Sequence, residues 1–118
     1  MFTAILSRDA EWASKMGERI LNQSIPLGRY VALKLFESPQ KLLRHLKTHG
    51  CGTVIMSIDH MDDLDYARDI SETGARLILL TDSNDIAIKA YSVCPDYCAL
   101  KHPDAEDFER ISSIIFCA

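Results

Sequence analysis

Two polar residues that could do chemistry, Ser57 and Asp59, stand at the end of an apolar run, "TVIMSID" over residues 53–59. A buried strand that ends on such residues commonly presents them to a site. Serine offers a neutral hydroxyl, whereas aspartate offers a carboxylate whose oxygens also suit Mg²⁺. The stretch therefore raises the question of whether this chain accepts a phosphoryl group or carries the same framework without that chemistry.

Polar residues also follow three other apolar runs of the chain. They are Ser7, Arg8 and Asp9; Thr81 and Asp82; and Lys101 and His102. The carboxyl ends of parallel strands meet at one edge of a sheet, and α/β proteins form their sites at that edge. If these runs are parallel strands, the sequence predicts one site built from all four groups.

Short apolar runs and helix-length segments alternate along the whole chain. The expected strands cover residues 3–7, 30–36, 53–58, 76–81 and 97–101. The expected helices begin after the capping residue Asp9 and at Ser38–Pro39, and cover residues 62–74, 83–92 and 103–115. Residues 25–28, Ile-Pro-Leu-Gly, are expected to break the chain between the first helix and the second strand.

The strand patterns predict the fold class. Residues 53–58 and 76–81 are apolar on both faces, as in a parallel sheet covered by helices on both sides, whereas residues 30–36 alternate and suit a sheet edge. We therefore expect an α/β protein with five βα units and a doubly wound, five-stranded parallel sheet in three layers. Residues 1–118 are expected to form one domain.

Composition excludes several function classes. The net charge of −4 and the pI of about 5.5 argue against nucleic-acid binding by this domain alone. No run is long enough to span a membrane and no signal peptide is evident, so we expect a cytoplasmic protein. His45 and His49, four residues apart, suit a solvated helix face better than a metal site. The cysteines are expected to be reduced thiols without a metal: Cys51, Cys94, Cys98 and Cys117.

The last third of the chain resembles a known family. "TDSNDIAIKAYSVCPDYCALKHP", residues 81–103, is similar to the second half of a response-regulator receiver domain of the LytR/AgrA type. Thr81, the stretch Ala87–Tyr91 and Lys101 match that motif, as does the separation of twenty residues between the threonine and the lysine. His102 stands where the family usually has proline. The resemblance implies a flavodoxin-like or receiver-like fold over nearly the whole chain.

The resemblance also implies a chemistry, which is transfer of a phosphoryl group from a histidine kinase to an aspartate on the third strand. In that family, acids after the first strand and the acceptor carboxylate hold Mg²⁺. The lysine after the fifth strand offsets phosphoryl charge, and the threonine after the fourth strand bonds the new group.

This chain departs from the family at the acidic half of the site. The acid pair falls on Ser7 and Arg8, which leaves only Asp9, and the acceptor position falls on Ser57. The guanidinium of Arg8 would repel a divalent cation, and a serine cannot form an acyl phosphate. The sequence therefore predicts a pseudo-receiver that has no catalytic residue and no cofactor, is not an enzyme, and acts through protein contacts.

Two alternatives remain open for the whole domain. Asp59 shares the strand parity of Ser57 and could be a genuine acceptor, with Asp9 and Asp59 as the ligands of Mg²⁺. The chain could instead be a small-ligand-binding α/β domain.

Two residues of the site carry alternatives of their own. Thr81 could be the switch residue or merely cap the next helix. Lys101 is expected to form a salt bridge with Asp9 or Asp59 in place of a phosphoryl group. The acids Asp62, Asp63 and Asp65 are expected to complement a helix dipole rather than hold a metal.

The partners are predicted from the resemblance. We expect a homodimer through the face formed by the fourth helix, the fifth strand and the fifth helix, with Tyr91, Tyr97 and Ile114 as contacts. Tyr97 should face away from Cys98, which occupies the family's switch-aromatic position. A histidine kinase is the other partner implied. DNA would be contacted only by a further domain of a transcription regulator, beyond residue 118.

Overall fold

A computed structural model gives the structure of the chain and describes residues 2–50 and 52–116. Cys51 and Cys117, two of the four expected thiols, lie outside the described residues. Cys94 and Cys98 are free cysteines, the first exposed and the second half-buried. No helix in the described part of the chain is long and apolar enough to cross a membrane.

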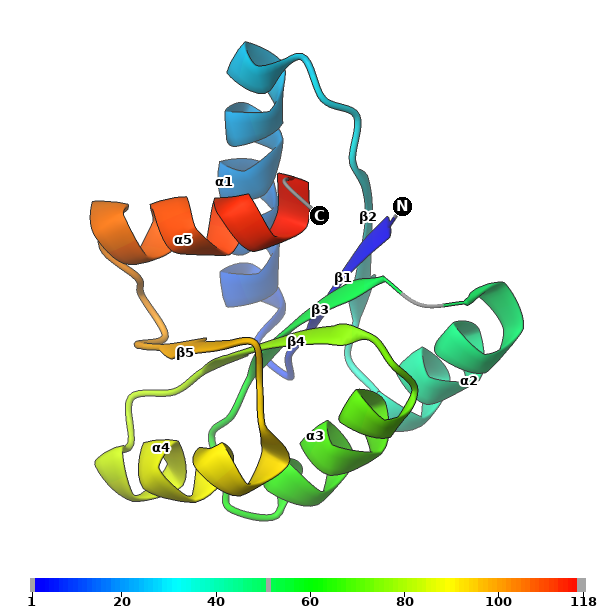
Figure 1. The fold of residues 1–118 in the computed structure, drawn as a ribbon, viewed down its shortest axis with the longest axis vertical. Coiled ribbons are helices and arrows are strands. Elements are labelled where there is room, and N and C mark those ends of the chain that lie inside the picture. The colour runs from blue at the N-terminus through cyan, green and yellow to red at the C-terminus, as the bar shows by residue number, and fades with distance from the viewer. Residues whose placement is uncertain (1, 51, 117–118) are drawn as a thin grey trace.

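Strands and helices alternate along the chain, as the sequence predicts (Figure 1). The strands are β1 (Phe2–Leu6), β2 (Ala32–Phe36), β3 (Thr53–Ser57), β4 (Arg76–Leu80) and β5 (Tyr97–Ala99). The helices are α1 (Ala10–Leu27), α2 (Pro39–His49), α3 (Asp63–Glu72), α4 (Asn84–Ala90), the 3₁₀ turn Tyr91–Val93 and α5 (Ala105–Phe116). The strands form one parallel sheet in the order β2-β1-β3-β4-β5, which places β2 at an edge.

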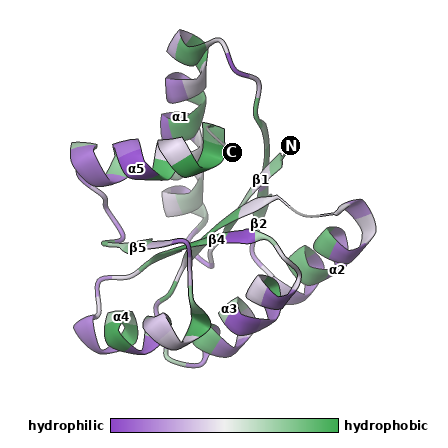
Figure 2. Ribbon diagram, viewed as in Figure 1, coloured by the Kyte–Doolittle hydropathy of each residue, from purple (hydrophilic) through white to green (hydrophobic). Residues whose placement is uncertain are grey.

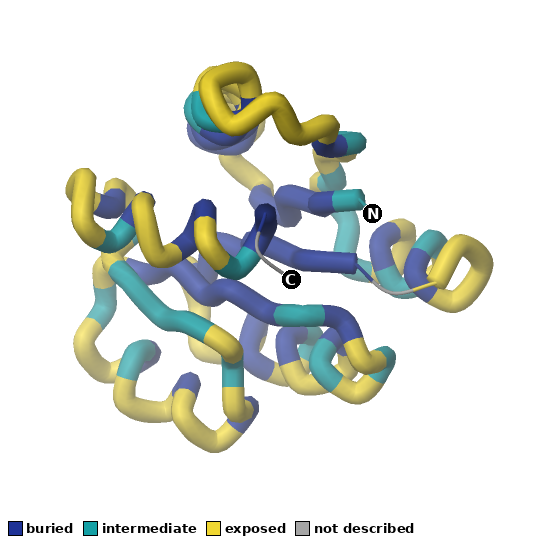
Figure 3. The backbone as a smooth tube through the Cα atoms, turned by 45° about the horizontal axis from the view of Figure 1, so that its top comes forward, coloured by how far each residue is buried: buried dark blue, intermediate teal, exposed yellow. Residues whose placement is uncertain are grey.

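Helices cover both faces of this sheet, so the predicted three-layer, doubly wound α/β fold is confirmed. Helices α1 and α5 lie on one face and α2, α3 and α4 on the other (Figure 1). Each central strand alternates between the two cores: Ile55 packs under α1 and α5, whereas Val54 and Met56 pack under α2, α3 and α4. In Figure 3 the middle of the sheet is buried throughout. Hydrophilic and hydrophobic residues are mixed within the helices in Figure 2, and the buried apolar ones belong to the two cores on either side of the sheet.

The starts of α1 and α2 are the ones that the sequence marks. Asp9 caps α1 by accepting a hydrogen bond from the backbone N–H of Trp12 (3.1 Å). Ser38 caps α2 in the same way, and Pro39 occupies the first helical position. These caps set where each helix leaves the carboxyl end of the strand before it.

The expected break at residues 25–28 is wrong by one helical turn. Helix α1 continues through Ile25 and Pro26 and ends at Gly28, which has a left-handed φ of 61°. Gly28 N–H donates to the carbonyl of Ile25, and Arg29 N–H donates to the carbonyl of Ser24. This pair of bonds is a Schellman motif, which satisfies carbonyls of the last helical turn.

Candidate functional site

The carboxyl ends of β1 and β3 bring two hydroxyls together. Ser7 follows β1 and Ser57 ends β3, and both side chains are buried. Ser57 Oγ donates a hydrogen bond of 2.7 Å to Ser7 Oγ, which also accepts from the backbone N–H of Asp9 (3.0 Å). The position that the resemblance assigns to the acceptor is therefore occupied by a hydroxyl that is already hydrogen-bonded to its neighbour.

A cation lies beside this pair and has its own partner. Arg8 Nη2 is 2.9 Å from Asp63 Oδ1, in a salt bridge between an exposed guanidinium and a carboxylate whose side chain is only 8% exposed. The other oxygen of Asp63 accepts from the backbone N–H of His60 (3.3 Å). Sequence reasoning gave Asp63 only a helix-dipole role and missed this contact. The sequence feature that could have indicated this contact is the position of Asp63 in the first turn of α3, directly after the loop that follows β3.

The opposite side of the site holds a second ion pair. Lys101 Nζ is 3.0 Å from Asp59 Oδ1, with side-chain exposures of 15% and 40%. The backbone N–H of Lys101 donates to Asp82 (3.1 Å), and its carbonyl accepts from Trp12 Nε1 (2.8 Å). The expected salt bridge of Lys101 is present, and Asp59 rather than Asp9 is the acid that forms it. Asp9 instead caps α1.

Thr81 lies directly after β4 and is buried. Its Oγ1 accepts from the backbone N–H of Ser83 (3.2 Å), and its own N–H donates to the carbonyl of Ala99 (3.0 Å). Ser83, not Thr81, caps α4 by accepting from the N–H of Ile86 (3.3 Å). The alternative that Thr81 caps this helix is wrong because the chain makes one more turn first. Its switch role stays a prediction.

The donors at this edge do not suit Mg²⁺, the ion that the resemblance implies. Mg²⁺ needs several oxygen ligands in octahedral geometry. Here the two serine hydroxyls bond each other, Asp63 is held by Arg8 and Asp59 is held by Lys101. The described residues contain no group of three or more His, Cys, Asp and Glu side chains that could hold a metal.

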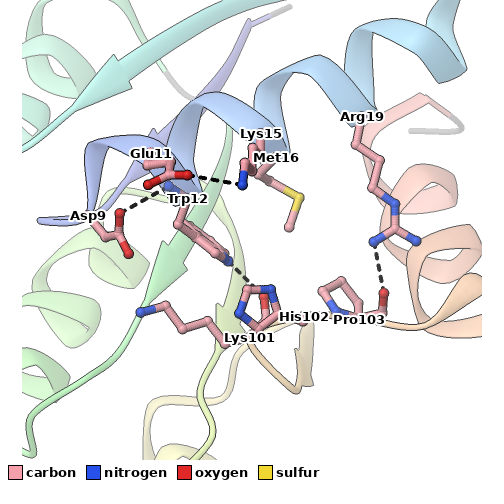
Figure 4. Close-up of a pocket in the computed structure, with 9 residues that line it drawn as sticks. All are labelled: Asp9, Glu11, Trp12, Lys15, Met16, Arg19, Lys101, His102 and Pro103. Atoms are coloured by element: carbon pink, nitrogen blue, oxygen red, sulfur yellow. Dashed lines mark hydrogen bonds and ion pairs between the residues drawn. The ribbon is translucent and has the colours of Figure 1, made fainter.

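Little space remains between these side chains. The cavity bordered by Ser7, Arg8, Ser57, Asp59 and Asp63 measures about 20 Å³. A larger one of about 210 Å³ lies next to it, between the start of α1 and the loop before α5 (Figure 4). Its lining cations are already engaged, since Lys15 pairs with Glu11 (3.1 Å) and Arg19 donates to the carbonyl of Pro103 (2.8 Å). The space enclosed between the two serines, Arg8, Asp59 and Asp63 is thus small, and the open space lies outside this group.

The three expected interface residues are not equally accessible. Tyr91 is 77% exposed, whereas Tyr97 and Ile114 are half-buried and pack against the core under α1 and α5. Tyr97 faces away from Cys98, as expected, and its hydroxyl donates to Asp107 Oδ1 (2.5 Å). That hydrogen bond, with burial second, raises the pKa of Tyr97. Sequence reasoning missed two further exposed apolar residues of this part of the chain, Ile88 on α4 and Leu100 after β5.

Comparison with solved structures identifies the fold. The BeF₃-activated DrrB receiver domain has 17% identity and a TM-score of 0.69 over 96% of this chain and 95% of that one. The response regulator receiver domain protein (CheY-like) from Methanospirillum hungatei has 19% identity and a TM-score of 0.67, covering 95% and 90%. The signal receiver domain of the putative response regulator NarL from Mycobacterium tuberculosis has 13% identity and a TM-score of 0.67, covering 93% and 90%. The chain has the receiver-domain fold.

Sequence comparisons add nothing to this result, because no protein-family model and no curated protein matches the sequence. At 13–19% identity the structural likeness establishes the receiver fold and its topology. The residues at the carboxyl ends of the strands are therefore what can indicate the function.

Proposed function

We propose that this chain is a receiver-fold regulatory domain that signals through protein contacts and does not accept a phosphoryl group. The observation that carries the proposal is the buried hydrogen bond between Ser57 Oγ and Ser7 Oγ, at the ends of β3 and β1. In the family that the chain resembles, carboxylates occupy these positions. A pair of neutral hydroxyls lends no charge to a divalent cation and cannot form an acyl phosphate.

The two ion pairs support a fixed rather than a switchable site. Lys101 is held by Asp59 and Arg8 is held by Asp63, so each cation of the site has an anion of the chain beside it. In the proposal, the Lys101–Asp59 pair takes the place of the contact between lysine and phosphoryl group. The domain thereby populates permanently one of the two states between which phosphorylation would select.

The proposal includes a biological context that the resemblance suggests. The domain would be the regulatory part of a transcription regulator of the LytR/AgrA type, and a separate domain would contact DNA. It would pair with a second copy through the face of α4, β5 and α5. The chain has a net charge of −4, which disfavours DNA binding by this domain and supports DNA contacts by a separate one.

One observation favours a second function, phosphorylation at Asp59. This carboxylate lies 3.0 Å from Lys101 Nζ, the contact that an acceptor would make with the family's lysine. In this alternative the domain is a conventional phospho-accepting receiver, with Asp9 and Asp59 as the candidate Mg²⁺ ligands and a histidine kinase as its phosphodonor.

Intact-mass spectrometry separates the two functions. The wild-type chain and Asp59→Asn are incubated with Mg²⁺ and acetyl phosphate. An unrelated conventional receiver, treated in the same way, is the positive control that shows the phosphodonor to be active. We expect neither form of this chain to gain the mass of a phosphoryl group. A gain in the wild type that Asp59→Asn abolishes would replace the first proposal with the second.

A further inference from the structure

The chain has an uneven charge distribution that the proposed function does not use. Residues 19–58 contain six Lys and Arg and one acid, Glu37, although the whole chain has more acids than bases and a net charge of −4. These residues include β2, the edge strand, and α2, which packs beside it (Figure 1). A local excess of positive charge in an acidic protein marks a surface that can attract an anion.

Part of this charge surrounds one shallow pocket. The pocket measures about 250 Å³, and its floor includes the half-buried rings of Phe36 and His45. Its rim includes Lys34, Lys41, Arg44 and His49. On α2, residues 41, 44, 45 and 49 have the spacing of one helix face. On β2, Lys34 and Phe36 lie on the same face of the strand, because Leu35 between them points the other way. Strand and helix thus contribute to the same pocket. We call it the α2 pocket.

The cations of the α2 pocket are not engaged with acids of the chain. Within residues 2–50 and 52–116, Lys34, Lys41 and Arg44 form no salt bridge, and no acidic side chain lines the pocket. This distinguishes it from the cavity of about 210 Å³ beside Lys101, whose cations already have partners. Three permanent positive charges therefore face solvent around one cavity.

Helix stability does not explain this arrangement. Cations in the last turn of a helix complement its dipole, which accounts for Lys47 and His49. Lys41 lies in the first turn of α2, where the dipole disfavours a positive charge, and Lys34 lies on another element. A bound anion would explain why these side chains converge.

His45 lies among aromatic rings and close to the same positive charges. The rings of His45 and His49 stack with centroids 4.2 Å apart, and His45 also contacts the rings of Phe2 (5.0 Å) and Phe36 (5.5 Å). Burial, followed by the positive charges of His49 and Lys34, lowers the pKa of His45. An anion in the pocket would offset these charges, so it would raise that pKa.

We propose that the α2 pocket binds a small phosphorylated ligand that also carries a flat ring, the chemistry of a mononucleotide. Lys34, Lys41 and Arg44 would contact the phosphate groups and the aromatic floor would contact the ring. A long nucleic acid fits less well, because it would run from this patch onto the remainder of the chain, which is strongly acidic. The proposal is independent of the phosphorylation state of the strand-end site.

Isothermal titration and NMR of the full chain test this proposal, with ADP and inorganic pyrophosphate as probes in buffer without Mg²⁺. The pocket variant is Lys41→Gln/Arg44→Gln. The matched control is Lys47→Gln/Lys89→Gln, which removes the same charge at exposed positions outside the pocket. We expect ADP to bind, pyrophosphate to compete, and the pocket variant to weaken ADP affinity by about tenfold while the control changes it by less than about twofold.

The His45 ring provides a second readout in the same samples. The pKa of His45 is measured from the pH dependence of its ring ¹H chemical shifts. Saturating ADP should raise this pKa in the wild type and leave it unchanged in the pocket variant. Three results would overturn the proposal: no binding of either probe at millimolar concentration, equal loss of affinity in both double variants, or binding only of a long single-stranded oligonucleotide.

Discussion

At the scale of single residues, the strand-end edge consists of pairs that satisfy one another. Ser57 bonds Ser7, Lys101 bonds Asp59 and Arg8 bonds Asp63. An unpaired charge at a partly buried position would cost free energy, and each pairing removes that cost. The charges of this edge thereby have partners within the chain, which is consistent with the proposed function.

The Lys101–Asp59 pair makes a measurable prediction. In a double-mutant cycle with Lys101→Gln and Asp59→Asn, we expect a coupling free energy of about 0.5–1 kcal/mol in urea unfolding, limited because Asp59 is substantially exposed. The Lys15–Glu11 pair on α1, exposed at both ends, is the matched control, and we expect about 0.3 kcal/mol there. High salt should reduce the control coupling more. A Lys101–Asp59 coupling no larger than the control would contradict a structural role for the pair.

The sequence predicted part of this residue-level picture. The positions of Thr81 and Lys101 after expected parallel strands placed both at the same edge, and Asp59 was one of the two acids expected to pair with Lys101. The Arg8–Asp63 pair was not predicted, because which acid reaches Arg8 depends on the path of the loop after β3. No local pattern in the sequence encodes that path.

At the scale of elements, two glycines show how tightly the helices and strands are fitted. Gly17 lies inside α1, facing β1 and β2, and an added Cβ would be 3.7 Å from Ile5 Cδ1 and 3.9 Å from Leu35 Cδ2. Gly52 precedes β3, where an added Cβ would approach the carbonyl oxygen of Phe2 too closely for any side chain. The first site has room for a methyl group, whereas the second is closed by backbone.

These two glycines should therefore respond in opposite directions to the same substitution. We expect Gly17→Ala to stabilise the domain by about 0.5–1 kcal/mol, because alanine restricts the unfolded chain and favours helix. We expect Gly52→Ala to destabilise it by about 1–3 kcal/mol, because β1 and β3 must separate locally. Urea unfolding of both variants checks this. A stabilising Gly52→Ala would show that β1 and β3 are not held this closely at residue 52.

Element prediction from the sequence succeeded where short-range signals decide the structure. The alternating pattern of residues 30–36 placed β2 at the sheet edge, and Asp9 and Ser38 marked two helix starts. The end of α1 was predicted too early, since a proline was read as a break. The helix instead ends at Gly28, where the left-handed φ of this residue and the backbone hydrogen bonds from Gly28 and Arg29 close the last turn.

At the scale of the whole molecule, exposed apolar residues are concentrated in two places. One comprises Leu21, Ile25, Leu27 and Tyr30 at the end of α1 and the loop after it. The other comprises Ile88 and Tyr91, with Leu100 after β5, which belong to the α4–β5–α5 side of the domain. Single exposed apolar residues are ordinary on protein surfaces, but several on one side of a domain suit a partner. Only the second group belongs to the face that the proposed homodimer uses.

The proposed homodimer therefore predicts that the two groups differ in their effect on association. Ile88→Asp/Tyr91→Asp places like charges on both sides of a twofold interface and removes its apolar contacts, so we expect the dimer dissociation constant to rise at least about tenfold. Tyr30→Asp changes a residue that is 90% exposed and lies outside that face, and we expect no change. Sedimentation equilibrium over a range of concentrations measures both. All three side chains are exposed, so stability should change little. Weaker association with Tyr30→Asp but not with the α4 variant would mean that the end of α1, rather than the α4 face, joins the two copies.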